Sequence, residues 1–352
     1  MNILITAPNL NSEINVSGIS TVVNSILEHN IEHNYFHFEI GKKDKKKSFY
    51  FEVIHLLIRI LFYPFFIHKN QINLIHQNVP FDFKGIIREF ILNRIGKLMQ
   101  IKTILHIHGG EFLFTVPKNY LIKYCIKTLL NTNEKVIVLS ELERNILSIN
   151  YGFNNSYVLP NSVSIQNKTL IKTFSKVPVF LFIGRIHESK GILEILKMFQ
   201  KLKNDFDFKF FLFGDGPLKN VIIDDLNKIL GDQFVYGGVV SGGKKMEVIS
   251  QADYFLLPSR YGEGLPMALL ESMSLGLIPI VSNDGSMEHL IQDGVNGIKV
   301  NKNDVEDLYE KINNIVRNQG MQSEISKNAI ETVFSSHNIK NYVEDLNAIY
   351  NA

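Results

Sequence analysis

The segment 259–285 holds the residues whose types and spacing are most suggestive of chemistry. An apolar run ends at Pro258, a glycine-rich loop follows, and Pro266 suits the first turn of a helix. Backbone N–H groups at such a helix start bind anions, and Gly264 lets a ligand approach the backbone closely. The sequence therefore predicts a phosphate site built on the amides near Gly264, Leu265 and Pro266.

Two glutamates flank this expected phosphate site. Glu263 lies in the loop and Glu271 follows eight positions later, inside the expected helix. A carboxylate beside a phosphate repels it unless the carboxylate faces neutral hydroxyl groups. We therefore expect both glutamates to accept hydrogen bonds from sugar or ribose hydroxyls.

A second loop carries two cations. In FIGRIHESKG, residues 182–191, Arg185 and Lys190 lie where an expected strand gives way to a helix. Arginine binds a diphosphate through two parallel hydrogen bonds, and lysine acts as a point charge. Either residue alone is typical of a solvated surface, but together with the helix start near Pro266 they indicate a diphosphate site.

The elements that must position these loops alternate between strands and helices. At 352 residues the chain is long enough for about two domains. Alternation of short apolar runs with helical segments is typical of a parallel sheet covered on both faces, so we expect an α/β fold of two doubly wound domains. A polar, proline-bounded linker is expected at 160–178, and the ligand is expected in the crevice between the domains. Strands are expected at 2–7, 73–76, 102–108 and 135–139, and then at 179–186, 208–213, 234–236, 254–258, 278–282 and 297–300, with a first helix at 19–29.

These motifs together resemble one enzyme family. GRIHESKG, the GDGP that begins at Gly214, and EGLPMALLE with its two glutamates are similar to the retaining nucleotide-sugar glycosyltransferases of the GT4 family. That resemblance implies the GT-B fold of two facing Rossmann-like domains. It implies an acceptor domain over 1–165, a nucleotide-sugar domain over 166–335, and a C-terminal helix at 336–352 that packs back on the first domain.

The resemblance also implies roles for individual residues. Arg185 and Lys190 would hold the donor diphosphate, Glu263 would contact the donor sugar, and Glu271 would bind the ribose. His108, in LHIHGGEF, would face the donor sugar. The remaining donor-binding positions would be Gly18, Asn161, Gly184, Gly214, Gly264, Leu265 and Pro266. The chain departs from the family where Ser17 replaces the first of two adjacent glycines and where Ser162 follows Asn161 in place of glycine.

We expect no metal ion and no other cofactor. His106 and His108 share one face of a strand, but only Glu111 could join them as a ligand, so packing is the favoured role for His106. The sequence 205–207 matches the metal-binding D-x-D of other glycosyltransferases, yet it falls at the amino edge of the sheet and is expected to be a turn. Cations and the helix dipole can instead stabilise the leaving diphosphate.

The two halves of the chain carry net charges of opposite sign. Residues 1–170 hold 18 Lys/Arg against 12 Asp/Glu, whereas residues 171–352 hold 19 against 23. A lysine-rich run at 42–47 precedes an apolar stretch at 49–68, which Glu52, His55 and Arg59 interrupt on one helical face. The stretch fits an interfacial helix on anionic lipid, and equally a buried helix behind a solvated loop. A second basic helical segment at 84–102 favours peripheral contact with a membrane.

The remaining expectations concern function and compartment. A single cysteine, Cys125, and the absence of a basic leader at the N-terminus indicate the cytoplasm, with peripheral contact at the inner face of the membrane. We expect transfer from a nucleotide sugar, UDP-linked, to a polyprenyl-diphosphate-linked or other lipid-linked glycan in O-antigen, lipopolysaccharide or capsule assembly. A nucleotide-sugar 2-epimerase and a non-catalytic partner subunit stay open as alternatives. Nucleic acid binding and hydride transfer are disfavoured, because no nucleic-acid module and no G-x-G-x-x-G motif is present.

Overall fold

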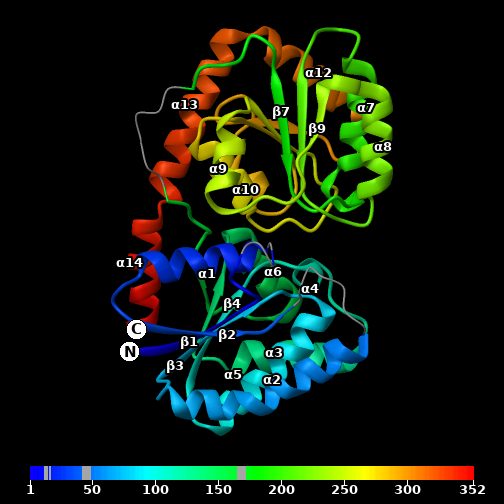
Figure 1. Ribbon diagram of the computed structural model, residues 1–352. Coiled ribbons are helices and arrows are strands. Elements are labelled where there is room, and N and C mark those ends of the chain that lie inside the picture. Colours follow the sequence, from blue (N-terminus) through cyan, green and yellow to red (C-terminus); the bar gives the residue numbers. More distant parts are fainter. Residues whose placement is uncertain (12–14, 16, 42–48, 165–171) are drawn as a thin grey trace. The chain divides into compact units, whose positions relative to one another are not determined.

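The computed structural model describes the chain except residues 12–14, 16, 42–48 and 165–171. It divides into two compact units, which are described separately (Figure 1). Unit 1 comprises Met1–Asn161 together with Ile339–Ala352, and unit 2 comprises Ser162–Asn338. Each unit is built on one parallel sheet with helices on both faces, as the alternation in the sequence predicts.

The sheet of unit 1 has the strand order β2-β1-β3-β4-β5-β6. Its strands are β1 (Asn2–Ala7), β2 (Asn34–Glu39), β3 (Leu74–Val79), β4 (Lys102–Ile107), β5 (Lys135–Val138) and β6 (Ser156–Val158). Its helices are α1 (Gly18–His29), α2 (Phe49–Lys69), α3 (Phe83–Leu98), α4 (Glu111–Phe114), α5 (Tyr120–Thr132), α6 (Glu141–Tyr151) and α14 (Ile339–Asn351).

The helices of unit 1 form two layers. Figure 1 shows α2, α3 and α5 on one face of the sheet and α1 and α14 on the other. One hydrophobic core lies under α3 and α5, around Leu105, Ile126 and Leu129. A second lies under α2, around Phe38 and Tyr63, whose rings meet edge to face at 4.8 Å. These cores hold the carboxyl ends of β3 and β4 in place.

The sheet of unit 2 has the order β12-β11-β10-β7-β8-β9. Its core is aromatic: Phe180 stacks on Tyr254 at 5.1 Å and meets Phe199 edge to face at 5.6 Å, so β7, β10 and one covering helix are tied together. The strands are β7 (Val179–Ile183), β8 (Lys209–Phe213), β9 (Phe234–Tyr236), β10 (Tyr254–Leu257), β11 (Ile278–Ser282) and β12 (Ile298–Val300). The helices are η1 (Glu188–Lys190), α7 (Ile192–Leu202), α8 (Lys219–Leu230), η2 (Gly231–Gln233), α9 (Gly242–Ser250), α10 (Met267–Ser274), α11 (Met287–Leu290), α12 (Val305–Arg317) and α13 (Gln319–Ser336).

Several expected boundaries were wrong. The basic helix expected to reach Lys102 ends at Leu98, because Gln100 adopts a left-handed conformation (φ 59°), and Lys102 begins β4. Pro266 is the N-cap of α10 rather than its first turn, and the helix starts at Met267. The strand expected at 179–186 stops at Ile183. The outer strands β2 and β6 were missed, because edge strands bury fewer residues and show weak apolar patterns.

Candidate functional site

Three loops meet at the carboxyl edge of the sheet in unit 2. They follow β7, β10 and β11, which are neighbours in the sheet. At their meeting point Lys190 Nζ lies 2.6 Å from Glu263 Oε1, so the structure brings together a predicted cation and a predicted carboxylate. Glu263 is buried and Lys190 is partly exposed. The pair places opposite charges beside the start of α10.

Further hydrogen bonds fix the Glu263 carboxylate and its backbone. Ser259 Oγ donates to Glu263 Oε1 at 2.5 Å, and the Glu263 N–H donates to Asp284 Oδ2 at 2.9 Å. Asp284 in turn pairs with Lys302 at 2.6 Å. A Cβ at Gly285 would lie 1.9 Å from the Glu263 carbonyl oxygen, so this loop can approach only because residue 285 is glycine. Glu263 is therefore preorganised.

A second ion pair ties the loops after β7 and β10 together. Arg260 donates through Nε at 2.9 Å and through Nη2 at 2.6 Å to the same oxygen of buried Glu194 in α7. The Arg260 N–H also donates to the Ser189 carbonyl oxygen at 2.8 Å. These bonds hold η1, which carries Lys190, against the loop that carries Glu263.

The other predicted residues of unit 2 lie on the same edge. Glu271 is buried in α10 and pairs with Lys245 of α9. Arg185 directly follows Gly184, is exposed, and has no ion pair among the described residues. Gly264, Leu265 and Pro266 form the connection from Glu263 into α10.

Gly214 joins the loops after β7 and β8. Its φ is 135°, and a Cβ there would lie 1.8 Å from the Gly184 carbonyl oxygen. The Gly214 N–H donates to Gly238 at 2.7 Å, so the loop after β9 is attached as well. Only glycine fits this crossing of backbones.

The carboxyl edge of unit 1 is different in chemistry. His108 follows β4, and its Nε2 lies 2.6 Å from Oδ1 of Asn78, near the end of β3. Asn78 is buried and also bonds to Thr6 of β1 through its backbone N–H at 3.0 Å and its amide Nδ2 at 2.8 Å. Three neighbouring strands therefore hold the His108 side chain.

Behind His108 lies a row of buried aromatic side chains. His106 stacks on His108 with ring centroids 4.1 Å apart, as their shared strand face predicts. His106 Nδ1 lies 3.1 Å from His76 Nε2, and His76 Nδ1 lies 2.5 Å from the Tyr350 hydroxyl in α14. Burial lowers the pKa of His76 to about 3. Burial, with a smaller contribution from the charge of His76, lowers the pKa of His108 to about 3, and the pKa of His106 also falls well below its usual value. The row is therefore neutral at pH 7.

The last two predicted positions belong to unit 1. Gly18 is the first residue of α1, after Ser17 at its N-cap, and no heavy atom lies within 4 Å of a Cβ built on it. Asn161 is buried at the end of unit 1.

Two patterns in the sequence, His106 with His108 and the D-x-D at 205–207, could in principle bind a metal ion. Within the described ranges, no group of three His, Cys, Asp or Glu side chains lies close enough to hold a metal ion. Asp205 and Asp207 lie before β8, at the amino edge, as expected, and Asp205 accepts a hydrogen bond from Tyr309 at 2.8 Å.

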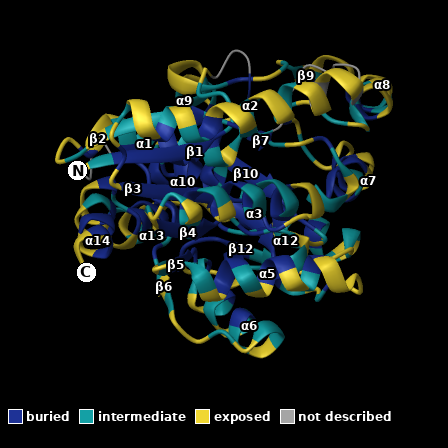
Figure 2. Cartoon of the chain, turned by 90° about the horizontal axis from the view of Figure 1, so that it is seen from below, coloured by how far each residue is buried: buried dark blue, intermediate teal, exposed yellow. Residues whose placement is uncertain are grey.

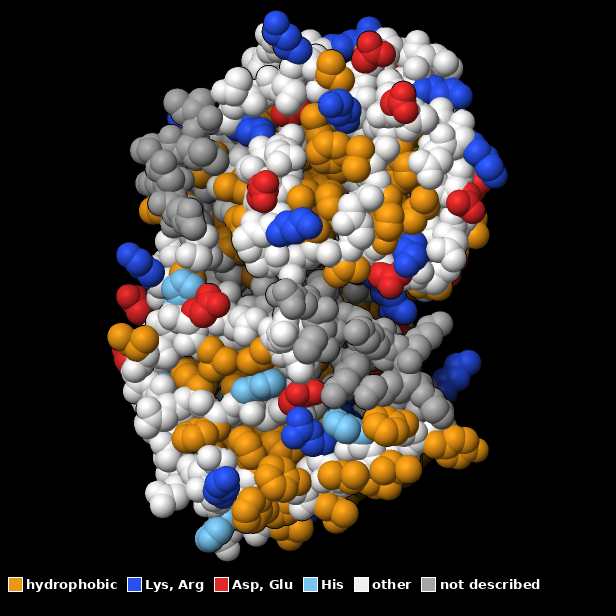
Figure 3. All heavy atoms as spheres, viewed as in Figure 1, with side chains coloured by type: hydrophobic (Ala, Val, Ile, Leu, Met, Phe, Trp, Pro, Cys, Tyr) orange, Lys and Arg blue, Asp and Glu red, His pale blue; other side chains and the backbone are white. Residues whose placement is uncertain are grey.

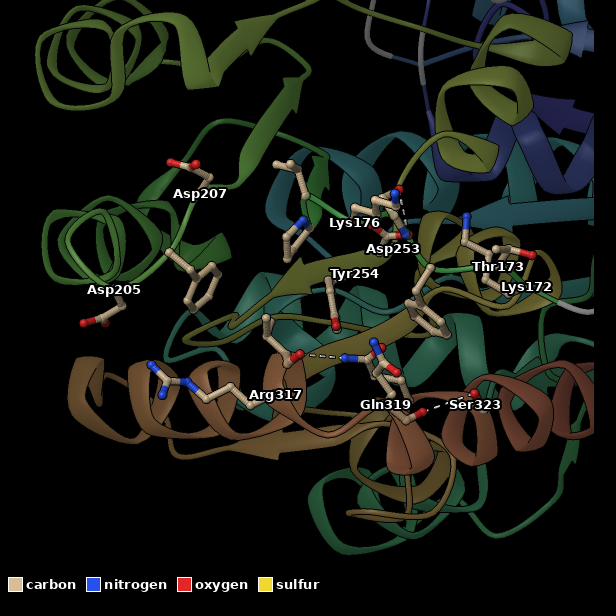
Figure 4. A pocket seen from close by; sticks show the side chains of 17 residues that line it. Lys172, Thr173, Lys176, Asp205, Asp207, Asp253, Tyr254, Arg317, Gln319 and Ser323 are labelled. Atoms are coloured by element: carbon tan, nitrogen blue, oxygen red, sulfur yellow. Dashed lines mark hydrogen bonds between the residues drawn. The ribbon is translucent and has the colours of Figure 1, made fainter.

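Both aspartates line a pocket of about 810 Å³ at that amino edge, and Figure 4 shows their carboxylates pointing away from Tyr254. The buried carboxylate of Asp253 in this pocket is already satisfied by the backbone N–H groups of Ser175 at 3.1 Å and Val179 at 2.9 Å. The pocket thus lies at the opposite end of the sheet from Glu263 and offers no free buried charge there.

Several residues that hold the site were missed from the sequence. Ser259, Asp284 and Arg260 bond to the predicted residues or their loops, and Asn78 does so in unit 1. Their partners are 4, 21, 66 and 30 positions away in the chain. Ser259 bonds within its own loop, whereas the pairs of Asp284, Arg260 and Asn78 are brought together by the order of the strands, so no local pattern signals them.

Comparison with known proteins relates the chain to a single kind of enzyme. Residues 166–332 match the family described as glycosyl transferases group 1. An uncharacterized glycosyltransferase of Methanocaldococcus jannaschii is 27% identical over 268 residues, which cover 75% of this chain and 71% of that protein. A UDP-Gal:alpha-D-GlcNAc-diphosphoundecaprenol alpha-1,3-galactosyltransferase of Escherichia coli is 26% identical over 294 residues, which cover 74% and 72%.

Solved structures agree on the fold. Sucrose-phosphate synthase from Thermosynechococcus elongatus superposes with a TM-score of 0.79 at 16% identity, covering 99% of this chain and 98% of that one. At such low identity the likeness concerns architecture alone. That architecture is GT-B, with two Rossmann-like parallel sheets, as the sequence motifs imply.

Proposed function

Since this chain is a group 1 glycosyltransferase of the GT-B fold, we propose that it transfers a sugar from a UDP-sugar to a hydroxyl of a lipid-linked glycan. Transfer proceeds with retention at the anomeric carbon and without a metal ion. The pathway is assembly of O-antigen, lipopolysaccharide or capsule on a polyprenyl diphosphate. The related Escherichia coli enzyme, whose name specifies UDP-Gal and a diphosphoundecaprenol acceptor, supports the choice of base and carrier.

One observation carries the proposal: the ion pair of Lys190 and Glu263 beside the N-terminus of α10. A leaving diphosphate needs positive charge, which Lys190, Arg185 and the amides at 264–265 supply. Once the diphosphate binds Lys190, Glu263 is released from its cation and can accept hydrogen bonds from the sugar. Glu271, which pairs with Lys245, would accept a hydrogen bond from the ribose.

A donor screen tests the choice of base and the absence of a metal. Binding stabilises the native state by mass action, so UDP-sugars should raise the melting temperature more than GDP- or ADP-sugars do. The shift and the transfer rate should persist in EDTA. A preference for a GDP-sugar contradicts the base, and loss of transfer in EDTA contradicts metal independence.

The transfer itself is tested with a synthetic polyprenyl-diphosphate-linked sugar. The anomeric configuration of the product, read by NMR, should match that of the donor. With a UDP-sugar and no acceptor, turnover should be nearly absent. Rapid conversion of the donor alone would instead identify a 2-epimerase.

We also propose that unit 1 contacts an anionic membrane through α2. The inner side of this helix, with Tyr63 and Ile67, packs on the core, while its outer side is apolar and exposed. Figure 2 shows the outer side of α2 as largely exposed, and Figure 3 shows hydrophobic side chains gathered on the same unit. The exposed apolar side chains are Tyr50, Phe51, Val53, Ile54, Leu57, Ile58, Leu61, Phe62 and Phe65.

The surroundings of α2 favour lipid as the partner. Among described residues of the same helical layer, Lys84 and Arg94 of α3 and Lys127 of α5 are exposed cations, suited to anionic head groups. Arg59, which was expected to share one helical face with Glu52 and His55, pairs with Glu39 at 3.5 Å. No described helix has both the length and the hydropathy to cross a bilayer, so an interfacial position is the one proposed. The lysine-rich run at 42–47 lies outside the described residues.

Flotation with vesicles tests the membrane contact. The protein should float with vesicles that contain phosphatidylglycerol and float less with neutral ones. Ile58→Ser with Leu61→Ser should abolish flotation, because Leu61 is 79% exposed and contributes little to the core. Ile149→Ser is the matched control, since Ile149 is 82% exposed on α6. Equal flotation of the double variant and the wild type would exclude α2 as the contact.

A further inference from the structure

The hydrogen bonds of Asn78 determine which way its side-chain amide points. Its Nδ2 lies 2.8 Å from the carbonyl oxygen of Thr6, which can only accept a hydrogen bond. The reversed amide would bring two acceptor oxygens together in a buried place, where neither could be satisfied by water. Asn78 Oδ1 must therefore face His108.

This orientation fixes the proton on His108. An amide oxygen only accepts, so the Nε2 of His108, 2.6 Å away, must carry the hydrogen. A neutral imidazole has one N–H, and its other nitrogen then presents a lone pair. His108 Nδ1 is that nitrogen, and it has no hydrogen-bond partner among the described residues.

The ring is held at two further points. The His108 backbone N–H donates to the Val79 carbonyl oxygen at 3.0 Å, and the His106 ring covers one face of the imidazole at 4.1 Å. His106 is fully buried, whereas His108 is only partly buried. The stacked ring and the amide together leave His108 little freedom to turn over and exchange its nitrogens.

We propose that Asn78 is a positioning residue that fixes His108 as its Nε2–H tautomer, so that Nδ1 accepts a hydrogen bond from a sugar hydroxyl. The choice of a sugar as ligand rests on the proposed function, but the tautomer does not. Thr6 belongs to the same device, because its carbonyl oxygen and its hydroxyl each hold one end of Asn78. A cation could not bind at a ring nitrogen that already carries hydrogen, and at Nδ1 it would compete with the hydroxyl.

Nitrogen NMR of the 15N-histidine-labelled protein tests the tautomer. The His108 signals, identified by their loss in His108→Gln, should show a protonated Nε2 and a bare Nδ1 at pH 7. Asn78→Ala removes the acceptor, and the two tautomers should then exchange. Asn78→Asp keeps an acceptor opposite Nε2, so Nε2 should keep its proton.

Asn93→Ala is the matched control for loss of a buried amide. Asn93 is buried on α3 in the same unit and bonds to Gln77 and Asn133, with no bond to His108. It should leave the tautomer unchanged. A wild-type spectrum with hydrogen on Nδ1, or an unchanged tautomer in Asn78→Ala, would overturn the proposal.

Kinetics separate this proposal from the proposed function. Asn78→Ala should lower kcat about tenfold, the usual effect of losing one hydrogen bond, and Asn78→Asp should restore part of it. If the tautomer changes while transfer does not, His108 has no role in transfer, although the assignment of the tautomer to Asn78 stands. If both variants lose activity alike with the tautomer intact, Asn78 acts on structure alone and the proposal fails.

Discussion

The carboxyl edges of the two sheets differ in the kind of side chains that they carry. In unit 2 the edge is built from ion pairs, among them Lys190–Glu263 and Arg260–Glu194. In unit 1 the corresponding edge has neutral imidazoles joined by an amide, as at His108 and Asn78. Buried charges are tolerated only when they are paired. Under the proposed function, a diphosphate would take over Lys190 from Glu263. Under that function, unit 2 would bind the charged diphosphate and unit 1 would bind uncharged hydroxyls.

The largest expected effect comes from breaking the charged edge. Lys190→Ala and Glu263→Ala should each lower the rate of transfer ~100-fold or more, the size typical of losing a preorganised charge-stabilising group. Lys201→Ala is the matched control, because Lys201 pairs with Glu306 on an exposed surface of the same unit. The measurement is kcat/KM with the fold checked by circular dichroism. Wild-type rates in a folded Lys190 or Glu263 variant would mean that the ion pair is only structural.

The next largest effect is on stability, when a glycine near each edge is replaced by alanine. Gly214→Ala should destabilise the protein by about 3 kcal/mol, because the added Cβ meets the Gly184 carbonyl oxygen and φ is positive. A Cβ at Gly18, the first residue of α1 in unit 1, meets no described atom within 4 Å, so Gly18→Ala should change the stability by no more than about 0.5 kcal/mol. Urea unfolding measures both. Similar losses in the two variants would show that the loops are equally crowded.

The neutral imidazoles of unit 1 should make the stability of the protein depend on pH. The pKa of His76 is about 3 in the folded chain against 6.5 for an ordinary histidine, so the unfolded chain binds more protons between these values. Stability is therefore intact above pH 6.5 and falls as the pH drops towards 3. His76 should therefore lower the free energy of unfolding at pH 5 by about 2 kcal/mol relative to pH 7.

Urea unfolding at pH 7 and pH 5 checks this expectation. His76→Gln should reduce the difference between the two pH values by about 2 kcal/mol, the share of His76, whereas His68→Gln, at an exposed position on α2, should leave it unchanged. Glu143 acts in the opposite sense, since burial raises its pKa to about 7 and its contribution is lost as the pH rises from 4.5 towards 7. An equal pH dependence in His76→Gln and the wild type would contradict the neutral row.

The smallest expected effect tests whether an exposed ion pair contributes as much to stability as a buried one. Lys201 and Glu306 are 47% and 57% exposed, and removing Lys201 should cost at most ~0.5 kcal/mol of stability. Thermal unfolding in low and high salt measures this cost. A loss as large as that of a buried pair would remove the distinction between the edge of unit 2 and its outer surface.

The fold was largely predictable because its signal is local. Runs such as VFLFI in β7 and YFLL in β10 are apolar throughout, as strands covered on both faces must be. Boundaries were less predictable where a single backbone conformation decides them, as Gln100 does at the end of α3. The edge strand β2 was missed because its side chains are mostly half-buried.

The site was predictable only in part. Residue types and spacing in two separate loops indicated Glu263 and Lys190, and the structure joins the two residues in one ion pair. Asn78 carries no comparable signal, because its importance lies in facing His108 across two strands. A residue that acts by orienting another is recognised from geometry, whereas the residue it orients can be recognised from the sequence.

The position of α14 has a consequence for how the chain is made. Tyr350, near the last residue, closes the buried row at His76, and Asn347 bonds to Asn30 beneath α1 at 2.6 Å. The ribosome therefore has to synthesise the whole of unit 2 before unit 1 can complete its interior. A chain truncated before α14 would hold all residues of unit 2 but an unsealed unit 1, which protein quality control could recognise.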